Sequence, residues 1–328
     1  MNIKAGIVGV GSYVPKEIHD NFYFEKIMDT SDEWIRTRTG IRERRVADES
    51  QATSDLASEA AKRALEDANI NAEDVDMLIV ATVSPDKILP STACIVQDNI
   101  GAVNASAFDI SAACSGFIYA LNIAKQFVEN GVYKNVLIIG AETLSRFLNY
   151  DDRSSSILFG DGAGAAVIAP VEGKGIMSAC MGADGSGKDY LDIPAGGSRN
   201  TASEDTVNSN LHKIRMAGSD VFKFAVRKMA ETSLEAIEKA GLGLEDIDYL
   251  IPHQANIRII EASAKRLKLG MDKVYVNLDS YGNMSAASIP VAMDEAYRKG
   301  KLKKGDTVVL VGFGGGLTWA ASVLEWSK

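Results

Sequence analysis

Three polar residues lie at predicted junctions between strands and helices, where their side chains could carry out chemistry together. Cys114 follows a predicted strand and precedes an apolar helix, and His253 directly follows an apolar strand. Asn283 lies among small residues ahead of another predicted helix. A thiol, an imidazole and a carboxamide at one place would supply a nucleophile and two hydrogen-bond donors.

Cys114 has two interpretations. The apolar residues behind it, from Phe117 to Val128, predict a buried helix. A thiol at the start of this helix would lie at the positive end of the helix dipole, beside free backbone N–H groups, which favours the thiolate and an oxyanion. Free cysteines are also commonly inert packing residues. The segment 109–117 alone leaves both interpretations open, whereas Cys94 and Cys180, with no histidine nearby, are predicted to be packing residues.

The chain contains an internal duplication. Residues 65–81 match residues 237–253 at a constant offset, and 109–114 pair with 278–283. The glycine-rich segments 160–167 and 312–319 form a further pair. We therefore predict two similar halves, 1–172 with the cysteine and 173–328 with the histidine and asparagine.

The duplication predicts that equivalent strand ends and helix starts converge between the halves. Cys114 and Asn283 would occupy equivalent helix starts, with His253 at the end of a neighbouring strand. His253 could instead be a core residue whose hydrogen bonds are made within the core. Its predicted place beside Cys114 makes that interpretation less favoured. Asn283 could be only a helix N-cap, and its pairing with Cys114 adds a second role.

Strands and helices alternate in each half, which predicts an α/β fold with helices covering mostly parallel central strands. The glycine motif at 9–11 fits a dinucleotide-binding fingerprint only weakly, and the one at 160–165 formally fits it. Pro15 follows the first motif and a strand follows the second, so we reject both.

Composition narrows the function classes. The 328 residues are 46% hydrophobic and 24% charged, with a net charge of −9, which disfavours general affinity for nucleic acid or anionic membranes. There is no signal-peptide pattern and no apolar run of the roughly 18 residues that a membrane span needs. Three cysteines and three histidines without metal-ligand spacing predict no metal site and a cytoplasmic location.

Residues 30–45 form the most basic segment of the chain. Trp34 beside Arg38 could hold a nucleotide base and its phosphates by stacking and bidentate contacts. Taken alone, the segment favours a solvated basic helix anchored by one tryptophan.

Five segments, in the correct order along the whole chain, resemble the signatures of the β-ketoacyl-ACP synthase III family. They are TSDEWIRTRTGIRERR, DISAACSGFIYAL, IPHQAN, YGNMSAASIP and GFGGGLTW. The resemblance implies a thiolase-like α-β-α-β-α sandwich of two pseudo-symmetric halves, a homodimer, and the condensation that initiates bacterial type II fatty acid synthesis.

The resemblance also implies a mechanism. The Cys114 thiolate would take the acyl group of a short acyl-CoA, such as acetyl-CoA. His253 and Asn283 would stabilise the enolate formed when malonyl-ACP loses CO₂. The backbone N–H groups of Cys114 and Gly315 would form the oxyanion hole, and the product would be a 3-oxoacyl-ACP. Acyl-CoA is a substrate here, so no cofactor is implied.

By the same resemblance, Trp34, Arg38 and Arg153 would hold the adenine and phosphates of CoA, and Leu89 would reach the partner subunit's acyl pocket. Residues of the pantetheine tunnel would be Gly218, Phe222 and Asn256. The acidic carrier protein would dock on a basic patch formed by Lys223, Arg258, Lys265 and Arg266, part of it close to His253 in sequence. The alternative is that these residues form only a solvated helix face. Met284 and Ala320 depart from the family pattern away from the reacting groups.

Other functions remain open at this point. A degradative thiolase needs a second cysteine near the carboxyl terminus, and none follows Cys180. Enzymes resembling hydroxymethylglutaryl-CoA synthase, or condensing enzymes and acyltransferases of secondary metabolism with another primer or extender, would use the same cysteine. A non-catalytic protein that binds acyl-CoA or the carrier is disfavoured by the intact trio of Cys114, His253 and Asn283. The sequence does not set the length or branching of the primer.

Overall fold

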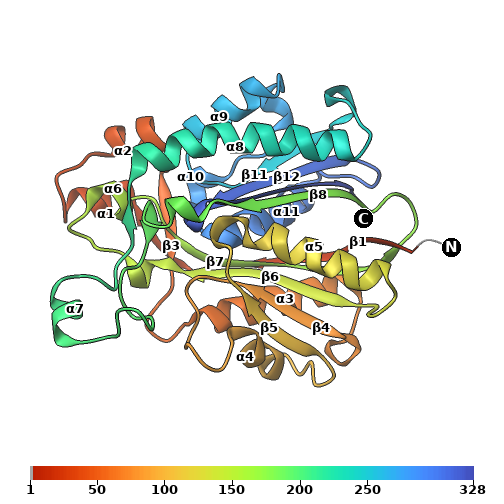
Figure 1. The fold of residues 1–328 in the computed structure, drawn as a ribbon, viewed down its shortest axis with the longest axis horizontal. Helices are drawn as coiled ribbons and strands as arrows, with labels where there is room; N and C mark the ends of the chain where they lie inside the picture. The colour runs from red at the N-terminus through yellow and green to blue at the C-terminus, as the bar shows by residue number, and fades with distance from the viewer. Residues whose placement is uncertain (1–2) are drawn as a thin grey trace.

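The computed structural model describes residues 3–328 and has two β-sheets sandwiched between three layers of helices (Figure 1). The first sheet has the strand order β1 (Lys4–Tyr13), β7 (Asp161–Val171), β6 (Val136–Thr143), β4 (Met77–Ala81) and β5 (Ser106–Ile110). The second has the order β11 (Tyr249–Pro252), β12 (Thr307–Gly314), β13 (Thr318–Glu325) and β8 (Ile176–Ala183). The predicted α-β-α-β-α sandwich is confirmed.

Parallel pairing is confined to part of each sheet. Strand β4 pairs in parallel with β5 and β6, and β11 pairs in parallel with β12. The remaining strands, β1, β7, β8 and β13, pair antiparallel with their neighbours. The prediction of mostly parallel strands is therefore correct for β4, β5, β6 and for the pair β11 and β12, and wrong for the others.

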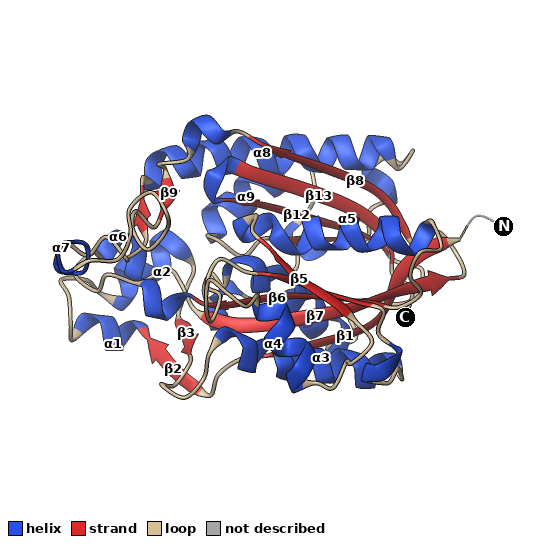
Figure 2. Ribbon diagram, turned by 60° about the horizontal axis from the view of Figure 1, so that its bottom comes forward, coloured by secondary structure: helices blue, strands red, loops and turns tan. Residues whose placement is uncertain are grey.

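Helices α5 (Gly116–Glu129) and α11 (Ser288–Arg298) fill the layer between the sheets (Figure 2). Phe117, Ile118 and Leu121 on α5 are fully buried there with side chains from both sheets, so the predicted burial of this helix is confirmed. Helices α3 (Thr53–Ala68) and α4 (Thr92–Asn99) cover the outer face of the first sheet, and α8 (Gly218–Lys239) and α9 (Ile257–Arg266) cover that of the second.

The glycines of β1 serve packing. A Cβ at Gly9 would lie 2.4 Å from the carbonyl oxygen of Ala64, and one at Gly11 would lie 2.4 Å from the backbone nitrogen of the same residue. Glycine at both positions thus lets β1 lie directly against α3, in agreement with the rejection of a dinucleotide site. Cys180 is buried as predicted, but Cys94 is exposed on α4, which corrects its prediction as a packing residue.

The duplication is present, and the predicted offset of 172 residues between 65–81 and 237–253 is confirmed, but the predicted register of the helix starts is wrong. The pairing of β4 with β6 corresponds to that of β11 with β12 when each residue is matched to the one 172 positions later, as Met77 is to Tyr249. The same offset relates two 3₁₀ turns, η2 (Ala113–Ser115) and η7 (Ser285–Ala287), whose first residues have φ of 46° and 44°. The equivalent of Cys114 is therefore Ala286, and Asn283 lies three positions earlier.

The predicted pairing of the glycine-rich segments is also wrong. Residues 161–167 lie in β7, whereas 312–314 end β12 and pair with the start of β13. The first sheet uses residues 4–171 and the second uses 176–325. The domain division at residue 172 stays a prediction.

Smaller elements surround one end of the sandwich. They are β2 (Glu17–Asp20), α1 (Asn21–Glu25), α2 (Asp32–Thr39), β3 (Glu43–Val46), α6 (Arg153–Ser156), β9 (Leu191–Asp192), α7 (Glu204–Asn208), β10 (Arg215–Met216) and α10 (Leu278–Tyr281). Across residues 3–328, no helix is both long and apolar enough to cross a membrane.

Candidate active site

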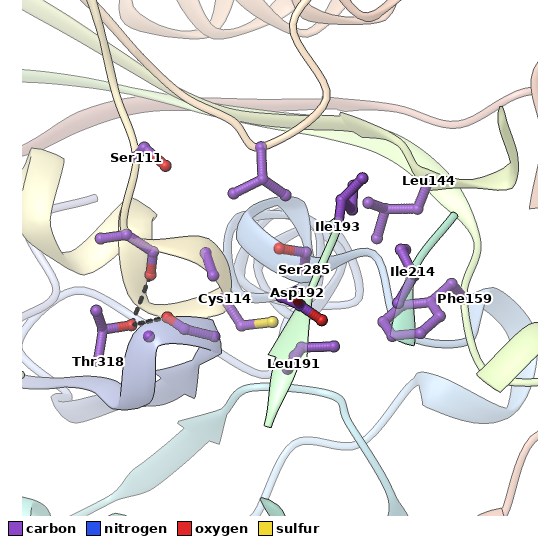
Figure 3. A pocket seen from close by; sticks show the side chains of 15 residues that line it. Ser111, Cys114, Leu144, Phe159, Leu191, Asp192, Ile193, Ile214, Ser285 and Thr318 are labelled. Atoms are coloured by element: carbon purple, nitrogen blue, oxygen red, sulfur yellow. Dashed lines mark hydrogen bonds between the residues drawn. The ribbon is translucent and has the colours of Figure 1, made fainter. Parts of the chain in front are cut away.

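Cys114 lies in the turn η2, just before α5 begins, and its side chain is only 5% exposed. It borders a cavity of about 460 Å³, into which its sulfur points (Figure 3). The segments between β6 and β7 and between β8 and α8 contribute much of the apolar lining. These contributed side chains are Leu144, Leu191, Ile193 and Ile214.

Two hydroxyl groups hold the turn that carries Cys114. The Ser115 and Thr318 hydroxyl oxygens lie 2.9 Å apart, and the Ser115 hydroxyl donates to the Ala112 carbonyl at 2.8 Å. The Thr318 hydroxyl donates to the same carbonyl at 2.9 Å (Figure 3). This network joins the nucleophile turn to the first residue of β13. It fixes the cysteine relative to the glycine-rich turn that connects β12 to β13.

The glycine-rich turn approaches Cys114 as its composition predicts. A Cβ at Gly314 would lie only 2.6 Å from the backbone nitrogen of Cys114, so only glycine fits there without a shift. Gly315 lines the same cavity as Cys114. The closest approach is thus at Gly314, next to the residue predicted for the oxyanion hole.

A second cavity, of about 90 Å³, brings the three predicted polar residues together. Cys114, His253 and Asn283 all line it, although they come from a 3₁₀ turn, a strand end and a loop. The three residues predicted for the pantetheine tunnel, Gly218, Phe222 and Asn256, line the same cavity. The structure therefore joins the predicted catalytic and tunnel residues at one place.

His253 is held as a neutral imidazole. Its side chain is 1% exposed, and the edge of its ring meets Phe313 with the centroids 5.5 Å apart. Burial lowers the pKa of His253 to about 3, because a charged ring would be poorly solvated there. Neither ring nitrogen has a hydrogen-bond partner within residues 3–328, which leaves both available to a ligand.

Asn283 is fixed by its backbone and by one side-chain atom. Its N–H donates to the Leu158 carbonyl at 2.8 Å, and its carbonyl accepts from the Gly160 N–H at 3.0 Å. The side-chain oxygen accepts a 2.9 Å hydrogen bond from the Ser285 N–H. Asn283 is therefore not the N-cap that its simpler interpretation predicts, since Met284 is the N-cap residue of η7. Its side-chain oxygen instead fixes the backbone two residues on, while its amide NH₂ group stays available to the cavity.

Trp34 lies between two arginines at the surface. The guanidinium carbons of Arg38 and Arg153 are 4.9 and 4.5 Å from the centroid of its ring. The Asn256 side chain donates a 3.0 Å hydrogen bond to the Arg38 carbonyl. A cationic aromatic cluster therefore adjoins the wall of the cavity that reaches Cys114.

Comparison with known proteins identifies the family. Residues 108–185 match the family described as 3-oxoacyl-[acyl-carrier-protein (ACP)] synthase III, and 237–326 match its C-terminal part. A β-ketoacyl-[acyl-carrier-protein] synthase III of Clostridioides difficile (strain 630) is 73% identical over 327 residues, covering 100% of both chains. The chain belongs to the β-ketoacyl-ACP synthase III family.

Solved structures agree with this family assignment. The chain is similar to 3-oxoacyl-[acyl-carrier-protein] synthase III from Aquifex aeolicus VF5, with a TM-score of 0.92 and 49% identity, covering 98% of this chain and 100% of that one. It is also similar to the priming β-ketosynthase of the R1128 polyketide pathway, with a TM-score of 0.93 and 36% identity, covering 100% and 97%. As a β-ketoacyl-ACP synthase III, the protein is a condensing enzyme of the acyltransferase class.

Other residues predicted for this synthase lie away from Cys114. Leu89 is 84% exposed and lines neither cavity. The basic residues predicted to dock the carrier are exposed on the neighbouring helices α8 and α9: Lys223, Arg258, Lys265 and Arg266. Their role in docking stays a prediction.

Burial changes the expected ionisation of Cys114, which the sequence predicted to favour the thiolate. The pKa of its thiol is raised to about 12, mainly by burial, while the Ser285 hydroxyl lowers it and the Glu142 carboxylate raises it. Sequence analysis missed both neighbours. A signal for Glu142 was available, since this acid follows the six residues Val136–Ala141, which have no polar side chain.

Proposed function

We propose that the protein condenses a short acyl-CoA primer, such as acetyl-CoA, with malonyl-ACP to give a 3-oxoacyl-ACP, CoA and CO₂. The observation that carries this proposal is the cavity lined jointly by Cys114, His253 and Asn283. A nucleophile and two neutral donors around one small space suit a reaction that forms both an acyl-enzyme and an enolate.

The first step is transfer of the acyl group to Cys114. Its thiolate attacks the thioester carbonyl, the tetrahedral oxyanion accepts hydrogen bonds from the Cys114 and Gly315 N–H groups, and CoA leaves as the thiol. The close approach of Gly314 to Cys114 supports this role for the glycine-rich turn. The cluster of Trp34 with Arg38 and Arg153 would bind the adenine and phosphates of CoA.

The second step is decarboxylation of malonyl-ACP. Loss of CO₂ leaves an enolate, whose oxygen would accept hydrogen bonds from His253 and Asn283. The lowered pKa of His253 supports a neutral donor, which can stabilise the enolate without protonating it. The enolate carbon attacks the acyl group on Cys114, and the thiolate leaves as the 3-oxoacyl-ACP forms.

The partners are inferred from surface features. The exposed basic residues Lys223, Arg258, Lys265 and Arg266 suit docking of an acidic carrier protein. Ile88 and Leu89 are 88% and 84% exposed, and large apolar side chains so exposed support contact with a second copy, hence a homodimer. All three cysteines are free, which supports a cytoplasmic location.

A second candidate function is the priming reaction of a secondary metabolic pathway. The likeness to the R1128 priming ketosynthase favours it, because that protein shares 36% identity over the whole of this chain. It would use the same Cys114, His253 and Asn283, and differ in the primer or extender.

One experiment tests both candidates. The protein is incubated with a panel of acyl-CoAs of graded length and branching, with either malonyl-ACP or malonyl-CoA as the extender, and adducts are located by mass spectrometry. We expect one acyl group on Cys114 and condensation with malonyl-ACP. An unmodified thiol across the panel would overturn the proposal, and a preference for long or unusual primers would favour the second candidate.

A further inference from the structure

Glu142 is a buried acid that the mechanism above does not use. It lies near the end of β6 with no exposed surface, and burial raises its pKa to about 7. Its carboxyl oxygens accept hydrogen bonds from the Ser84 hydroxyl at 2.6 Å and from the Val83 N–H at 3.1 Å. No salt bridge involves it within residues 3–328. Burial of a carboxyl group without a cationic partner costs free energy, and such groups often have a functional role.

Ser285 is a buried hydroxyl without a partner. It is 3% exposed, lines the larger cavity with Cys114, and makes no hydrogen bond through its oxygen to any residue from 3 to 328. Figure 3 shows its side chain among those that line this cavity together with the Cys114 sulfur. Its turn η7 packs against both η2, which carries Cys114, and β6, which carries Glu142, and the same hydroxyl lowers the pKa of both groups. Rotation about its single side-chain torsion would let it turn toward either one.

The duplication explains why Glu142 faces this hydroxyl. The offset of 172 residues matches Glu142 to Gly314 and Ser285 to Ala113. In one half, a Cβ at Gly314 would lie 2.8 Å from that of Ala113. In the other half, the corresponding strand end carries the Glu142 side chain toward Ser285. Because η2 and η7 pack against each other, the acid reaches the neighbourhood of Cys114.

A proton transfer between the two groups avoids a second buried negative charge. A buried site accommodates one negative charge far more readily than two, and the Glu142 carboxylate disfavours a thiolate at Cys114. Moving the thiol proton to the carboxylate keeps the net charge unchanged and removes this repulsion. The two groups then titrate as a coupled pair that shares one charge.

We propose that Glu142 accepts the proton of Cys114 and that the Ser285 hydroxyl relays it. The S–H bond breaks as its proton passes to the Ser285 oxygen, and the original Ser285 hydroxyl proton passes to Glu142. This leaves a thiolate and a neutral carboxylic acid. The proton returns by the same path to the departing CoA sulfur, so that CoA leaves as a thiol. The return step rests on the proposed acylation of Cys114, whereas formation of the thiolate does not.

Most other titratable groups near Cys114 and Glu142 are neutral or are hydrogen-bonded to other residues. His253 is neutral across the smaller cavity. Four other charged side chains on the surrounding elements make hydrogen bonds of their own to other groups: Asp55, Asp86, Arg146 and Asp161. Asp192 also lines the larger cavity, but it is partly exposed on β9, so Glu142 is the fully buried acid placed to exchange a proton with Cys114.

The test measures how fast iodoacetamide alkylates Cys114 at a series of pH values. In the wild-type protein the rate should level off once the pair has lost its first proton, because the fraction of thiolate is then constant. In Glu142→Gln the plateau should disappear, because no second group shares the charge, and the rate should rise about tenfold per pH unit above neutral pH, where the wild-type rate is flat. A Glu142→Gln variant that keeps the plateau would overturn the proposal, whatever its rate.

A second variant tests the relay even if Glu142→Gln fails to fold. Ser285→Ala is structurally mild, because Ala113 has the same φ in the equivalent turn. It should keep the plateau, which depends on the charge shared by Glu142 and Cys114, but slow the acylation of Cys114 by acetyl-CoA; an unchanged acylation rate would overturn the Ser285 step. Asp161→Asn, which removes another buried acid, should keep the shape of the profile, and loss of its plateau would contradict a specific role for Glu142. Alkylation needs no acyl-CoA, so its outcome is independent of acyl loading.

Discussion

Gly314 and Cys114 are in such close contact that a single added methyl group would lie 2.6 Å from the cysteine nitrogen. This contact sets the distance between the nucleophile turn and the glycine-rich turn. The proposed oxyanion hole depends on it, since its two N–H donors come from these two turns.

We expect Gly314→Ala to lower kcat/KM about 100-fold by displacing the N–H donors. Steady-state kinetics with acetyl-CoA and malonyl-ACP check this, with circular dichroism to verify folding. Gly197→Ala is the matched control, because a Cβ there meets nothing within 4 Å, and it should leave the kinetics unchanged. A folded Gly314→Ala variant with wild-type kinetics would show that the contact does not matter to the reaction.

Removal of the Trp34 ring should weaken binding of acyl-CoA. We expect Trp34→Ala to raise KM for acetyl-CoA about tenfold while kcat stays close to wild type, since the ring lies outside both cavities at the reacting centre. Arg36→Ala is the control on the same helix, because Arg36 pairs with Asp32. An unchanged KM in Trp34→Ala would show that the cluster of Trp34 with Arg38 and Arg153 does not bind CoA.

His253 should make stability depend on pH. Its folded pKa of about 3 lies below the ordinary value of 6.5, so the unfolded chain binds a proton that the folded chain does not. Stability is therefore lost as pH falls below 6.5, by up to about 1.4 kcal/mol per pH unit. Urea titrations of wild type and His253→Asn at several pH values should show this extra slope only in the wild type. Equal slopes would mean that His253 protonates freely in the folded protein.

The architecture could be predicted from the sequence because the duplication leaves matching segments in the two halves. Matching strands and helices predicted two similar halves, and strand ends predicted that Cys114 and His253 would lie together. The register of the helix starts was harder to predict. Each helix is preceded by a 3₁₀ turn that begins with a residue at positive φ, so the predicted pairing of Cys114 with Asn283 was wrong by three positions.

The roles of Glu142 and Ser285 could not be predicted in the same way. They are 143 positions apart in the chain, and they meet only because two equivalent turns pack across the interface between the halves. The ionisation state of Cys114 could not be predicted from the sequence either. A helix dipole can be inferred from a pattern of residues, whereas the degree of burial that outweighs it depends on every surrounding side chain.

The separate roles of Cys114 and His253 are tested most directly by measuring two steps of the reaction in one variant. Acylation of Cys114 by acetyl-CoA and release of CO₂ from malonyl-ACP are measured together in His253→Ala, with Cys114→Ala as the variant that cannot be loaded. We expect His253→Ala to acquire the acetyl group at close to the wild-type rate, and its decarboxylation rate to fall about 100-fold or more. Equal loss of both steps would contradict the proposed roles.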